Sequence, residues 1–373
     1  MTQAQQVTWS YLPRQFQEID AIVAAFKTFV PTGDFTLGQP LQQFEATFAK
    51  LMNARFAIGV NSGTDAIKLS LKVIGIKPGD EVITAAHTFV ATVGAIHELG
   101  AVPILVDCQE DGCMSVADIA SKITRKTKAI VPVHWGGQMV DMPALIACAE
   151  AHHLPVIEDA CQAMFSEINQ QKAGSFGKMG CFSLHPLKAI NVWGDGGVIV
   201  TDDEALNERL RLYRNHGLKS RDEVVLLGYN SRLDTLQAIV GLSLLPRVDG
   251  LISKRIENLR ILDEGLSQIP EIRLPPRYPN RRLVCHLYVI YVEQRDALYR
   301  YCLTQGVEVK IHYPKPLYQQ PGLAHLGYRK GDFPVIDRHA ETMISLPMHQ
   351  HHTSEEMAYV VKVVSDFYKQ QRS

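Results

Sequence analysis

A lysine in an apolar stretch is the residue of this chain best suited to covalent chemistry. Lys188 lies within residues 179–201, between small and apolar neighbours, and lysines usually keep their ammonium group in water. The stretch opens as a short buried strand and continues through Gly194-Asp195-Gly196-Gly197 into a second, β-branched strand. This layout could hold an amine against a bound ligand, although a lysine solvated in a surface loop is the alternative.

A carboxylate follows a predicted strand upstream of this lysine. Asp159 closes the strand predicted over residues 155–158, which places it at the carboxyl edge of a parallel sheet, where open α/β sheets bind ligands. A buried carboxylate needs a cationic partner, and a protonated pyridine nitrogen would serve. Gln162 could then reach an oxygen on the same ring. The alternative is that Asp159 caps the next helix.

Two further motifs lie between predicted strands and helices. Asn61-Ser62-Gly63-Thr64-Asp65 could bind a phosphate, because a glycine permits close approach and a helix N-terminus offers free N–H groups. A simple helix cap explains the same residue types. Phe89 follows the strand predicted over residues 81–85 and could stack on a flat ligand, although such a phenylalanine is often a core residue.

Together these motifs predict pyridoxal 5'-phosphate as the cofactor. A phosphate on a helix N-terminus, a carboxylate at a ring nitrogen, an aromatic on the ring and a lysine that forms a Schiff base are the parts that this chemistry needs. The protonated ring withdraws electrons, so negative charge on the adjacent carbon is stabilised. Lys188, once released, can move a proton between carbon atoms as a general base.

The elements that must position these residues alternate between strand and helix, which predicts a parallel α/β sheet with helices on both faces. A long apolar helix is expected over residues 236–245, and Pro246 marks a kink or a boundary. We therefore expect a large cofactor-binding domain over residues 1–245 and a smaller α+β domain over residues 246–373. The main strands are predicted over residues 55–60, 81–85, 102–107, 128–134, 155–158 and 198–201.

Composition narrows the class of protein. The chain has 373 residues, 46% of them hydrophobic, a net charge of -1 and no block of basic residues, so nucleic acid and anionic membranes are not expected partners. No apolar run approaches the ~20 residues that span a bilayer, and the first residues lack a signal pattern. Seven scattered cysteines without CxxC spacing indicate reduced thiols, a cytoplasmic protein and no zinc site.

The combined motifs are similar to those of the DegT/DnrJ/StrS group of sugar aminotransferases, within the fold-type I pyridoxal phosphate enzymes. The resemblance covers nearly the whole chain and implies an α/β fold, with a mixed, mostly parallel sheet between helices and a smaller C-terminal α+β domain. The motifs that carry it are Gly38-Gln39-Pro40, Ser62-Gly63-Thr64-Asp65-Ala66, Pro78-Gly79-Asp80-Glu81-Val82, Glu158-Asp159-Ala160-Cys161-Gln162, Phe182-Ser183-Leu184-His185-Pro186-Leu187-Lys188, Gly194-Asp195-Gly196-Gly197, Gly228-Tyr229-Asn230-Ser231-Arg232-Leu233-Asp234, His312-Tyr313-Pro314 and Ser345-Leu346-Pro347.

The resemblance also implies roles for individual residues. Lys188 forms the Schiff base, Asp159 meets the pyridine nitrogen, Gln162 bonds the ring hydroxyl, Phe89 stacks on the ring, and Gly63, Thr64 and Ser183 hold the phosphate. Asn230 matches a residue donated to the neighbouring subunit's phosphate, which implies a homodimer with shared active sites. His185, His312, Tyr313 and Tyr318 are the candidates for substrate contacts. Two positions depart from the group, because Cys161 replaces a common alanine and Tyr318 replaces a common histidine.

The expected activity is transfer of an amino group, with L-glutamate as the expected donor, onto a nucleotide-linked keto-sugar. Asp195 in the glycine turn favours amination at C3, and a 4-keto-sugar enzyme is the alternative. A pyridoxal phosphate deoxysugar dehydratase would carry histidine at the position of Lys188. A non-catalytic, cofactor-bound regulator would not need the complete set of reactive residues, and a nicotinamide oxidoreductase would need GxGxxG after the first strand.

One further cluster could suggest a metal. His349-Gln350-His351-His352 contains three potential ligands, but no carboxylate or cysteine flanks it at ligand spacing. We therefore expect a surface loop there and no metal site.

Overall fold

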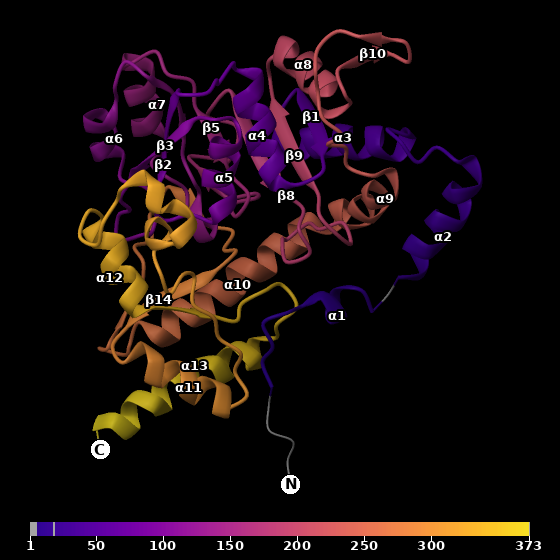
Figure 1. Ribbon diagram of the computed structural model, residues 1–373. Helices are drawn as coiled ribbons and strands as arrows, with labels where there is room; N and C mark the ends of the chain where they lie inside the picture. Colours follow the sequence, from indigo (N-terminus) through magenta and orange to yellow (C-terminus); the bar gives the residue numbers. More distant parts are fainter. Residues whose placement is uncertain (1–5, 18, 373) are drawn as a thin grey trace.

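A mixed β-sheet forms the centre of the larger part of the molecule. The computed structural model describes residues 6–17 and 19–372 (Figure 1). One group of strands has the order β3-β2-β4 and is parallel, and the other has the order β1-β9-β8-β5. Parallel bridges from Ile130 to Val156 and from Val133 to Asp159 join the two groups. The strands are β1 (Phe56–Val60), β2 (Glu81–Ala85), β3 (Val102–Val106), β4 (Thr127–Val131), β5 (Ile157–Asp159), β8 (Met179–Ser183) and β9 (Gly197–Thr201).

Only β9 runs against its neighbours in this sheet, since it pairs antiparallel with both β1 and β8. The predicted mixed, mostly parallel sheet is thereby confirmed. β9 carries the chain back from the loop that contains Lys188, so the loop is held between two adjacent strands.

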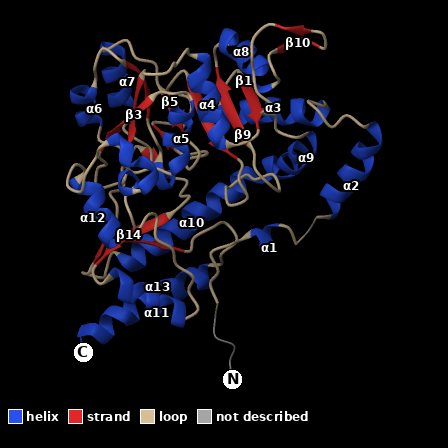
Figure 2. Cartoon of the chain, in the orientation of Figure 1, coloured by secondary structure: helices blue, strands red, loops and turns tan. Residues whose placement is uncertain are grey.

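Helices cover both faces of the sheet (Figure 2), and each face has its own core. Val198 and Val200 of β9 lie in one hydrophobic cluster, while Ile199 lies in the other. This alternation follows from the two-residue period of a strand that is buried on both sides. The helices around the sheet are α3 (Gln39–Met52), α4 (Gly63–Val73), α5 (Val90–Glu98), α6 (Val116–Lys122), α7 (Met142–Ala151), α8 (Glu204–Arg214) and α9 (Thr235–Leu244).

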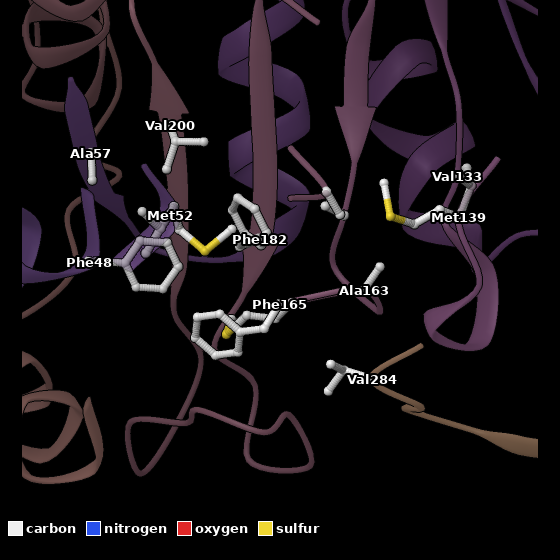
Figure 3. Packing of buried hydrophobic residues seen from close by; sticks show 14 of the residues in the cluster. Phe48, Met52, Ala57, Val133, Met139, Ala163, Phe165, Phe182, Val200 and Val284 are labelled. Carbon is white, nitrogen blue, oxygen red and sulfur yellow. The ribbon is translucent and has the colours of Figure 1, made fainter. Parts of the chain in front are cut away.

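Aromatic side chains from distant segments fill the first of these cores. Phe48 of α3 packs edge-on against Phe182 of β8, with the ring centroids 5.6 Å apart, and Phe165 lies nearby (Figure 3). The contact fixes α3 against the strand that leads into the Lys188 loop.

The C-terminal part is a smaller α+β unit. Its sheet has the order β12-β14-β15, and its core includes Leu262, Ile290 and Val364. Val7, from the other end of the chain, belongs to this core and forms a bridge with Val307. The elements are α10 (Val248–Leu266), β12 (Ile272–Arg273), β14 (Tyr288–Val292), α11 (Arg295–Thr304), α12 (Pro334–Thr342), β15 (Met343–Leu346) and α13 (Ser354–Arg372).

Short elements complete the described chain. They connect the larger ones or form small hairpins at the edge of the molecule. They are α1 (Leu12–Gln15), α2 (Asp20–Phe29), η1 (Val30–Thr32), η2 (Trp135–Gly137), β6 (Glu167–Ile168), β7 (Gln171–Lys172), β10 (Leu218–Ser220), β11 (Glu223–Val224), η3 (Leu245–Arg247), β13 (Arg281–Arg282), η4 (Leu317–Gln319) and η5 (Pro321–Leu326).

The predicted domain boundary falls inside a helical run. α9 continues through the 3-10 turn at Pro246 into α10, as the proline predicts, and α10 crosses from the upper to the lower part of Figure 1. Val248 and Ile252 still pack in the core around the large sheet, whereas Leu259 packs in the C-terminal core. A division after residue 245 remains a prediction.

The same run, Thr235–Leu266, is the one helical stretch of the described residues that is long and apolar enough to cross a membrane. Half of its most apolar window is buried inside the protein. Its apolar side chains, such as Leu244 and Val248, lie in the large core, which accounts for the composition without a membrane.

Candidate active site

A cavity of about 410 Å³ opens at the carboxyl edge of the large sheet. Asp159 ends β5, Ser183 ends β8, and Gly63 and Phe89 follow the loops after β1 and β2. The topology therefore collects residues that are far apart in the sequence. The predicted site residues that line this cavity are Gly63, Thr64, Phe89, Asp159, Gln162, Ser183, His185, Lys188, His312 and Tyr313.

Lys188 lies half-buried in the loop between β8 and β9, and its Nζ is 3.5 Å from Nε2 of His286. Its backbone carbonyl accepts hydrogen bonds from the Tyr11 hydroxyl (2.5 Å) and the Asn191 amide (3.2 Å), so the loop is anchored on both sides. Burial lowers the pKa of the amine, against the opposing charges of Cys161 and Asp159. A lysine with a lowered pKa is the nucleophilic form, and the solvated-loop alternative is wrong.

Asp159 is a buried carboxylate, 5% exposed, that forms no ion pair among the described residues. Its Oδ2 accepts a hydrogen bond from the Thr92 hydroxyl (2.7 Å), and its Oδ1 accepts one from the Cys161 amide (3.2 Å). No helix begins directly after Asp159, so the helix-cap alternative is wrong. A charge held this way at a cavity wall fits a protonated ring nitrogen.

The N-terminus of α4 points its first residues at the cavity. Ser62 caps the helix by accepting a hydrogen bond from the Asp65 amide (3.0 Å), which confirms the capping interpretation for that residue. A Cβ atom at Gly63 would lie 2.9 Å from Cys161 Sγ and 2.9 Å from Ser183 Cβ, so glycine allows α4 to approach the end of β8. The first N–H groups of a helix have no partner within it. Ser62 accepts a hydrogen bond from that of Asp65, whereas those of Gly63 and Thr64, two residues that line the cavity, are placed to bind an anion.

Phe89 and Gln162 border the space between this anion site and Lys188. Phe89 is 54% exposed, so the core alternative for it is wrong. Its ring lies 6.5 Å from that of Tyr313, with an angle of 35° between the planes. Burial raises the pKa of Tyr313 to about 12, although a hydrogen bond with Gln162 acts in the opposite direction. Gln162 is fixed because its Oε1 accepts a hydrogen bond from the Gly136 amide (2.8 Å).

The candidates for substrate contacts divide into two groups. His185 is exposed at the cavity, and burial and Lys188 lower its pKa. The Nδ1 of His312 lies 2.8 Å from the Ser345 hydroxyl, and burial lowers its pKa to about 4. Tyr318, by contrast, does not line the cavity: it is 2% exposed, packs on Phe333, and donates a hydrogen bond to Asp337. In this chain Tyr318 is placed as a core residue.

Asn230 also lies outside this cavity. It is exposed and forms a backbone bridge with Asn215, close to the β10–β11 hairpin. Its expected contact with a neighbouring subunit stays a prediction.

Two residues of the site, Thr92 and His286, were not predicted from the sequence. Thr92 orients Asp159, and its four-residue spacing from Thr88, whose hydroxyl it meets at 2.7 Å, is the signal that could have found it. His286 contacts Lys188 across 98 residues of sequence, and no spacing rule connects the two. Burial lowers the pKa of His286 well below its usual range, so this imidazole is neutral.

The histidine cluster does not form the expected surface loop. His349 and His352 are 2% and 1% exposed, and their rings stack 3.4 Å apart. The loop is pulled inward because the Asn258 amide donates hydrogen bonds to the carbonyls of both residues. That prediction is wrong.

A different trio has the residue types of a metal site. Ligand atoms of His87, Cys108 and His339, all buried, lie within 4.8 Å of one another. Both ring nitrogens of His87 face backbone carbonyls, at 3.2 and 3.3 Å, and Cys108 lies 3.7 Å from His339. None of the three lines the cavity that contains Lys188.

Comparison with known proteins gives relatives that match along nearly the whole chain. A "Pleiotropic regulatory protein" of Geobacillus stearothermophilus is 37% identical over 364 residues, which cover 96% of this chain and 97% of that protein. The UDP-N-acetyl-3-dehydro-alpha-D-glucosamine 3-aminotransferase of Acidithiobacillus ferrooxidans is 37% identical over 346 residues, 92% of this chain and 93% of the relative.

Solved structures also match this protein along nearly its whole chain. DesV of S. venezuelae, crystallised with a ketimine intermediate, superposes with a TM-score of 0.94 at 34% identity, over 97% of this chain and 98% of that one. NtdA of Bacillus subtilis, with its cofactor PMP bound, superposes with a TM-score of 0.90 at 30% identity. The match covers 98% of this chain and 85% of NtdA.

The cavity fits the cofactor of these enzymes. Asp159 offers a buried charge to the ring nitrogen, Lys188 offers an amine with a lowered pKa, and α4 offers its N-terminus to the phosphate. A sequence profile of the DegT/DnrJ/EryC1/StrS aminotransferase family matches residues 17–365. The chain therefore belongs to this family of pyridoxal phosphate-dependent aminotransferases, as its motifs predict.

Proposed function

We propose that this aminotransferase moves an amino group from L-glutamate to C3 of a nucleotide-linked keto-hexose. The observation that carries amino transfer is the half-buried Lys188, whose lowered pKa and position opposite Asp159 suit covalent attachment of an amine-transferring cofactor. The identity of the donor, L-glutamate, and the position of amination, C3, go beyond what this observation supports and are proposed in addition.

The residues of the cavity divide the work of the reaction. Pyridoxal phosphate, when bound, supplies an electron-withdrawing ring that stabilises negative charge on the carbon next to the amine. Asp159 would stabilise positive charge on the ring nitrogen of the bound cofactor, and Thr92 holds that carboxylate in place through a hydrogen bond. Lys188 takes the proton from one carbon and returns it to another through Nζ, which the neutral His286 contacts at 3.5 Å.

Amination at C3 is supported by relatives and by one residue. The Acidithiobacillus relative is named for a 3-aminotransferase reaction, and relatives from Streptomyces venezuelae and Aneurinibacillus thermoaerophilus are named as transaminases of 3-amino sugars. Asp195, the residue of the glycine turn that favours C3, lines the cavity beside Lys188. Amination at C4 is the alternative, since one methylene separates aspartate from glutamate at this turn.

A regulator that does not catalyse is the competing function, because one relative carries that name. Selection for cofactor binding alone would not require a reactive lysine, a carboxylate at the ring nitrogen and a second residue that orients this carboxylate. All three are present here as Lys188, Asp159 and Thr92. The lysine likewise argues against a dehydratase.

A homodimer with shared sites completes the proposal. Asn230 is exposed outside its own cavity, and the nearby hairpin exposes Val224, Val225 and Leu227, the last by 89%. Apolar side chains exposed together mark a surface that a partner covers. The seven free cysteines also suit a reducing compartment such as the cytoplasm.

Shared sites predict complementation between two inactive variants. A mixed dimer of Lys188→Ala and Asn230→Ala holds one site free of both changes. Random exchange should therefore restore about a quarter of wild-type activity, since half of the dimers are mixed and each has one intact site. Subunit exchange is verified by native mass spectrometry, and no recovery after exchange contradicts a shared site.

The substrate part is tested by incubating the purified protein with L-glutamate and matched nucleotide-linked 3-keto and 4-keto hexoses, with mass spectrometry of the products. We expect amination of the 3-keto sugars only. Turnover of 4-keto sugars alone overturns the assignment of amination to C3. If the enzyme is fully loaded with cofactor and turns over neither class of sugar, the result favours a regulator that does not catalyse.

A further inference from the structure

We propose that Arg255 binds a carboxylate group of the amino-acid donor, in a small cavity that adjoins the one containing Lys188. This inference rests on the proposed function for the identity of the donor. Nothing in the motifs singles out Arg255, which lies in α10 at the junction of the two parts of the molecule.

Arg255 is a buried cation without a carboxylate partner. It is 2% exposed, its Nη1 donates a hydrogen bond to the Cys285 carbonyl (2.7 Å), and its side chain also hydrogen-bonds Tyr11, but its Nε has no partner among the described residues. Within the described part of the chain no aspartate or glutamate forms an ion pair with it. An uncompensated buried charge is strongly unfavourable, so an anionic ligand would be stabilised at this position.

The guanidinium faces a space that adjoins the active site. A cavity of about 90 Å³ is lined by Arg255, Tyr11, His286, His312 and His349, among others. Its residues His286 and His312 also line the larger cavity, and a narrow gap on the other side touches both Arg255 and Lys188. Since a water molecule occupies about 30 Å³ in the liquid, this space can hold a carboxylate and the carbon atoms next to it.

A second unpaired donor faces the same cavity. His349 accepts a hydrogen bond at Nδ1 from the His351 amide (3.2 Å), which places the ring proton on Nε2. That Nε2 has no hydrogen-bond partner among the described residues. Two orphaned N–H groups, on Arg255 and His349, therefore require an acceptor, and a carboxylate has two oxygen atoms to offer.

The donor fits this cavity better than the nucleotide does. An amino acid carries a carboxylate one carbon away from the amine that must reach the site of Lys188. A diphosphate with its nucleoside is too large for about 90 Å³. The local charge also favours an anion, because burial, His352 and Arg255 lower the pKa of His349, and no carboxylate in the described part of the chain pairs with Arg255.

The binding test uses the holoenzyme and glutarate, a dicarboxylate without an amine, by calorimetry. Arg255→Gln should weaken glutarate binding at least about tenfold, as expected for loss of a charged hydrogen bond. Arg255→Lys keeps the positive charge and should weaken glutarate binding by a smaller factor. The matched control is Arg260→Gln on the same helix, where the side chain is exposed and paired with Glu264, and it should bind as the wild type does. Unchanged affinity in Arg255→Gln overturns the proposal.

Half-reactions identify which carboxylate is bound. In single turnovers followed by cofactor absorbance, Arg255→Gln should slow the reaction with L-glutamate and leave the reverse reaction from the amino-sugar unchanged. Equal slowing with L-alanine assigns the α-carboxylate, and slowing with glutamate alone assigns the side-chain carboxylate. Equal slowing of both half-reactions, or weaker binding of UDP or dTDP instead of glutarate, overturns the donor site.

A crystal of the wild-type holoenzyme soaked in glutarate keeps the proposal testable if Arg255→Gln does not fold. Carboxylate density between Arg255 and His349 is the expected result, and its absence there overturns the proposal. If glutarate binds at Arg255 but glutamate is not a donor, the proposed function fails and the anion site stands. If glutamate reacts equally with wild type and Arg255→Gln, the proposed function stands and the donor site at Arg255 fails.

Discussion

Two buried arginines in this protein have opposite surroundings. Arg214 is 5% exposed and forms ion pairs and hydrogen bonds with Glu45, which also accepts hydrogen bonds from Arg211 (2.8 Å) and the Gly59 amide (2.8 Å). Arg255 is 2% exposed, and no carboxylate among the described residues forms an ion pair with it. Asp159, which lines the same cavity as Lys188, is a buried anion that forms no ion pair among the described residues.

The difference separates a structural charge from a functional one. At Glu45 the desolvation of each charge is offset within the protein, so the cluster connects α3, β1 and α8 and has no further ligand to bind. Around Lys188 the charges are left to be matched by molecules that arrive from solution. Unmatched buried charge thus marks the side of the molecule where ligands bind.

The largest effect should come from Lys188 itself. Lys188→Ala removes the nucleophile and the proton carrier together, so we expect steady-state turnover to fall by about 10⁴-fold or more, while the cofactor still binds through α4 and Asp159. Absorbance of the purified variant and coupled turnover assays measure the two quantities.

Borohydride reduction of the wild-type protein identifies the lysine directly. The cofactor should become attached to Lys188, as found by peptide mapping. An adduct on another lysine contradicts the assignment.

The comparison of Glu45 with Asp159 predicts that substitutions of these two carboxylates change stability by different amounts. Glu45→Gln leaves Arg214 buried without a counter-charge, and the free energy of unfolding of the apoprotein should fall by about 3 kcal/mol or more. Asp159→Asn removes a charge that forms no ion pair among the described residues and leaves a side chain that can still hydrogen-bond, so the free energy of unfolding of the apoprotein should change by less than about 1 kcal/mol, while cofactor affinity falls at least about tenfold. Urea unfolding and cofactor titration measure both. Equal destabilisation by the two substitutions would remove the distinction.

Acid should destabilise the histidine-rich side next to Arg255. Burial lowers the pKa of His352 to about 4, against a usual value of 6.5. Above pH 6.5 this imidazole is neutral in both states; between pH 6.5 and about 4 the unfolded chain gains a proton and the folded chain does not, so stability falls as pH falls through this window.

His352→Gln tests that contribution. The loss of unfolding free energy between pH 7 and pH 5 should shrink by up to about 2 kcal/mol relative to wild type, because each pH unit is worth about 1.4 kcal/mol per proton. Urea unfolding at the two pH values gives the difference. His153→Gln, at a helix end where the residue is exposed, is the control and should leave the pH dependence unchanged.

The smallest effect is expected at Tyr318. Tyr318→Phe removes the hydrogen bond to Asp337 and should lower stability by about 1 kcal/mol, with the KM for the sugar and kcat both within about twofold of wild type. A large rise in KM would place Tyr318 in sugar recognition after all. Steady-state kinetics and thermal unfolding separate these outcomes.

Local patterns in the sequence predict the parts of the site that lie near strand ends. Gly63, Asp159 and Lys188 each sit where a strand meets a turn, and the C-terminal ends of parallel strands must share one edge. The continuous apolar run of β9 likewise indicates a strand that is buried on both faces, and its side chains pack alternately in the two cores.

Contacts that join distant segments have no such local signal. His286 reaches Lys188 from the C-terminal unit, Tyr11 bonds the carbonyl of Lys188 from the N-terminal segment, and Asn258 draws the histidine loop inward. Each depends on how two separately folded surfaces meet, which no spacing within one segment encodes.

The sequence by itself determined the fold class, the family and the cofactor of this protein, because these depend on residue types at fixed positions relative to single strands and helices. Only the tertiary structure decided which charges are compensated. Glu45 and Arg214 are 169 residues apart, and packing brings no carboxylate of the described residues into an ion pair with Arg255. Whether a buried charge is matched depends on what packs around it, and that is a property of the assembled core.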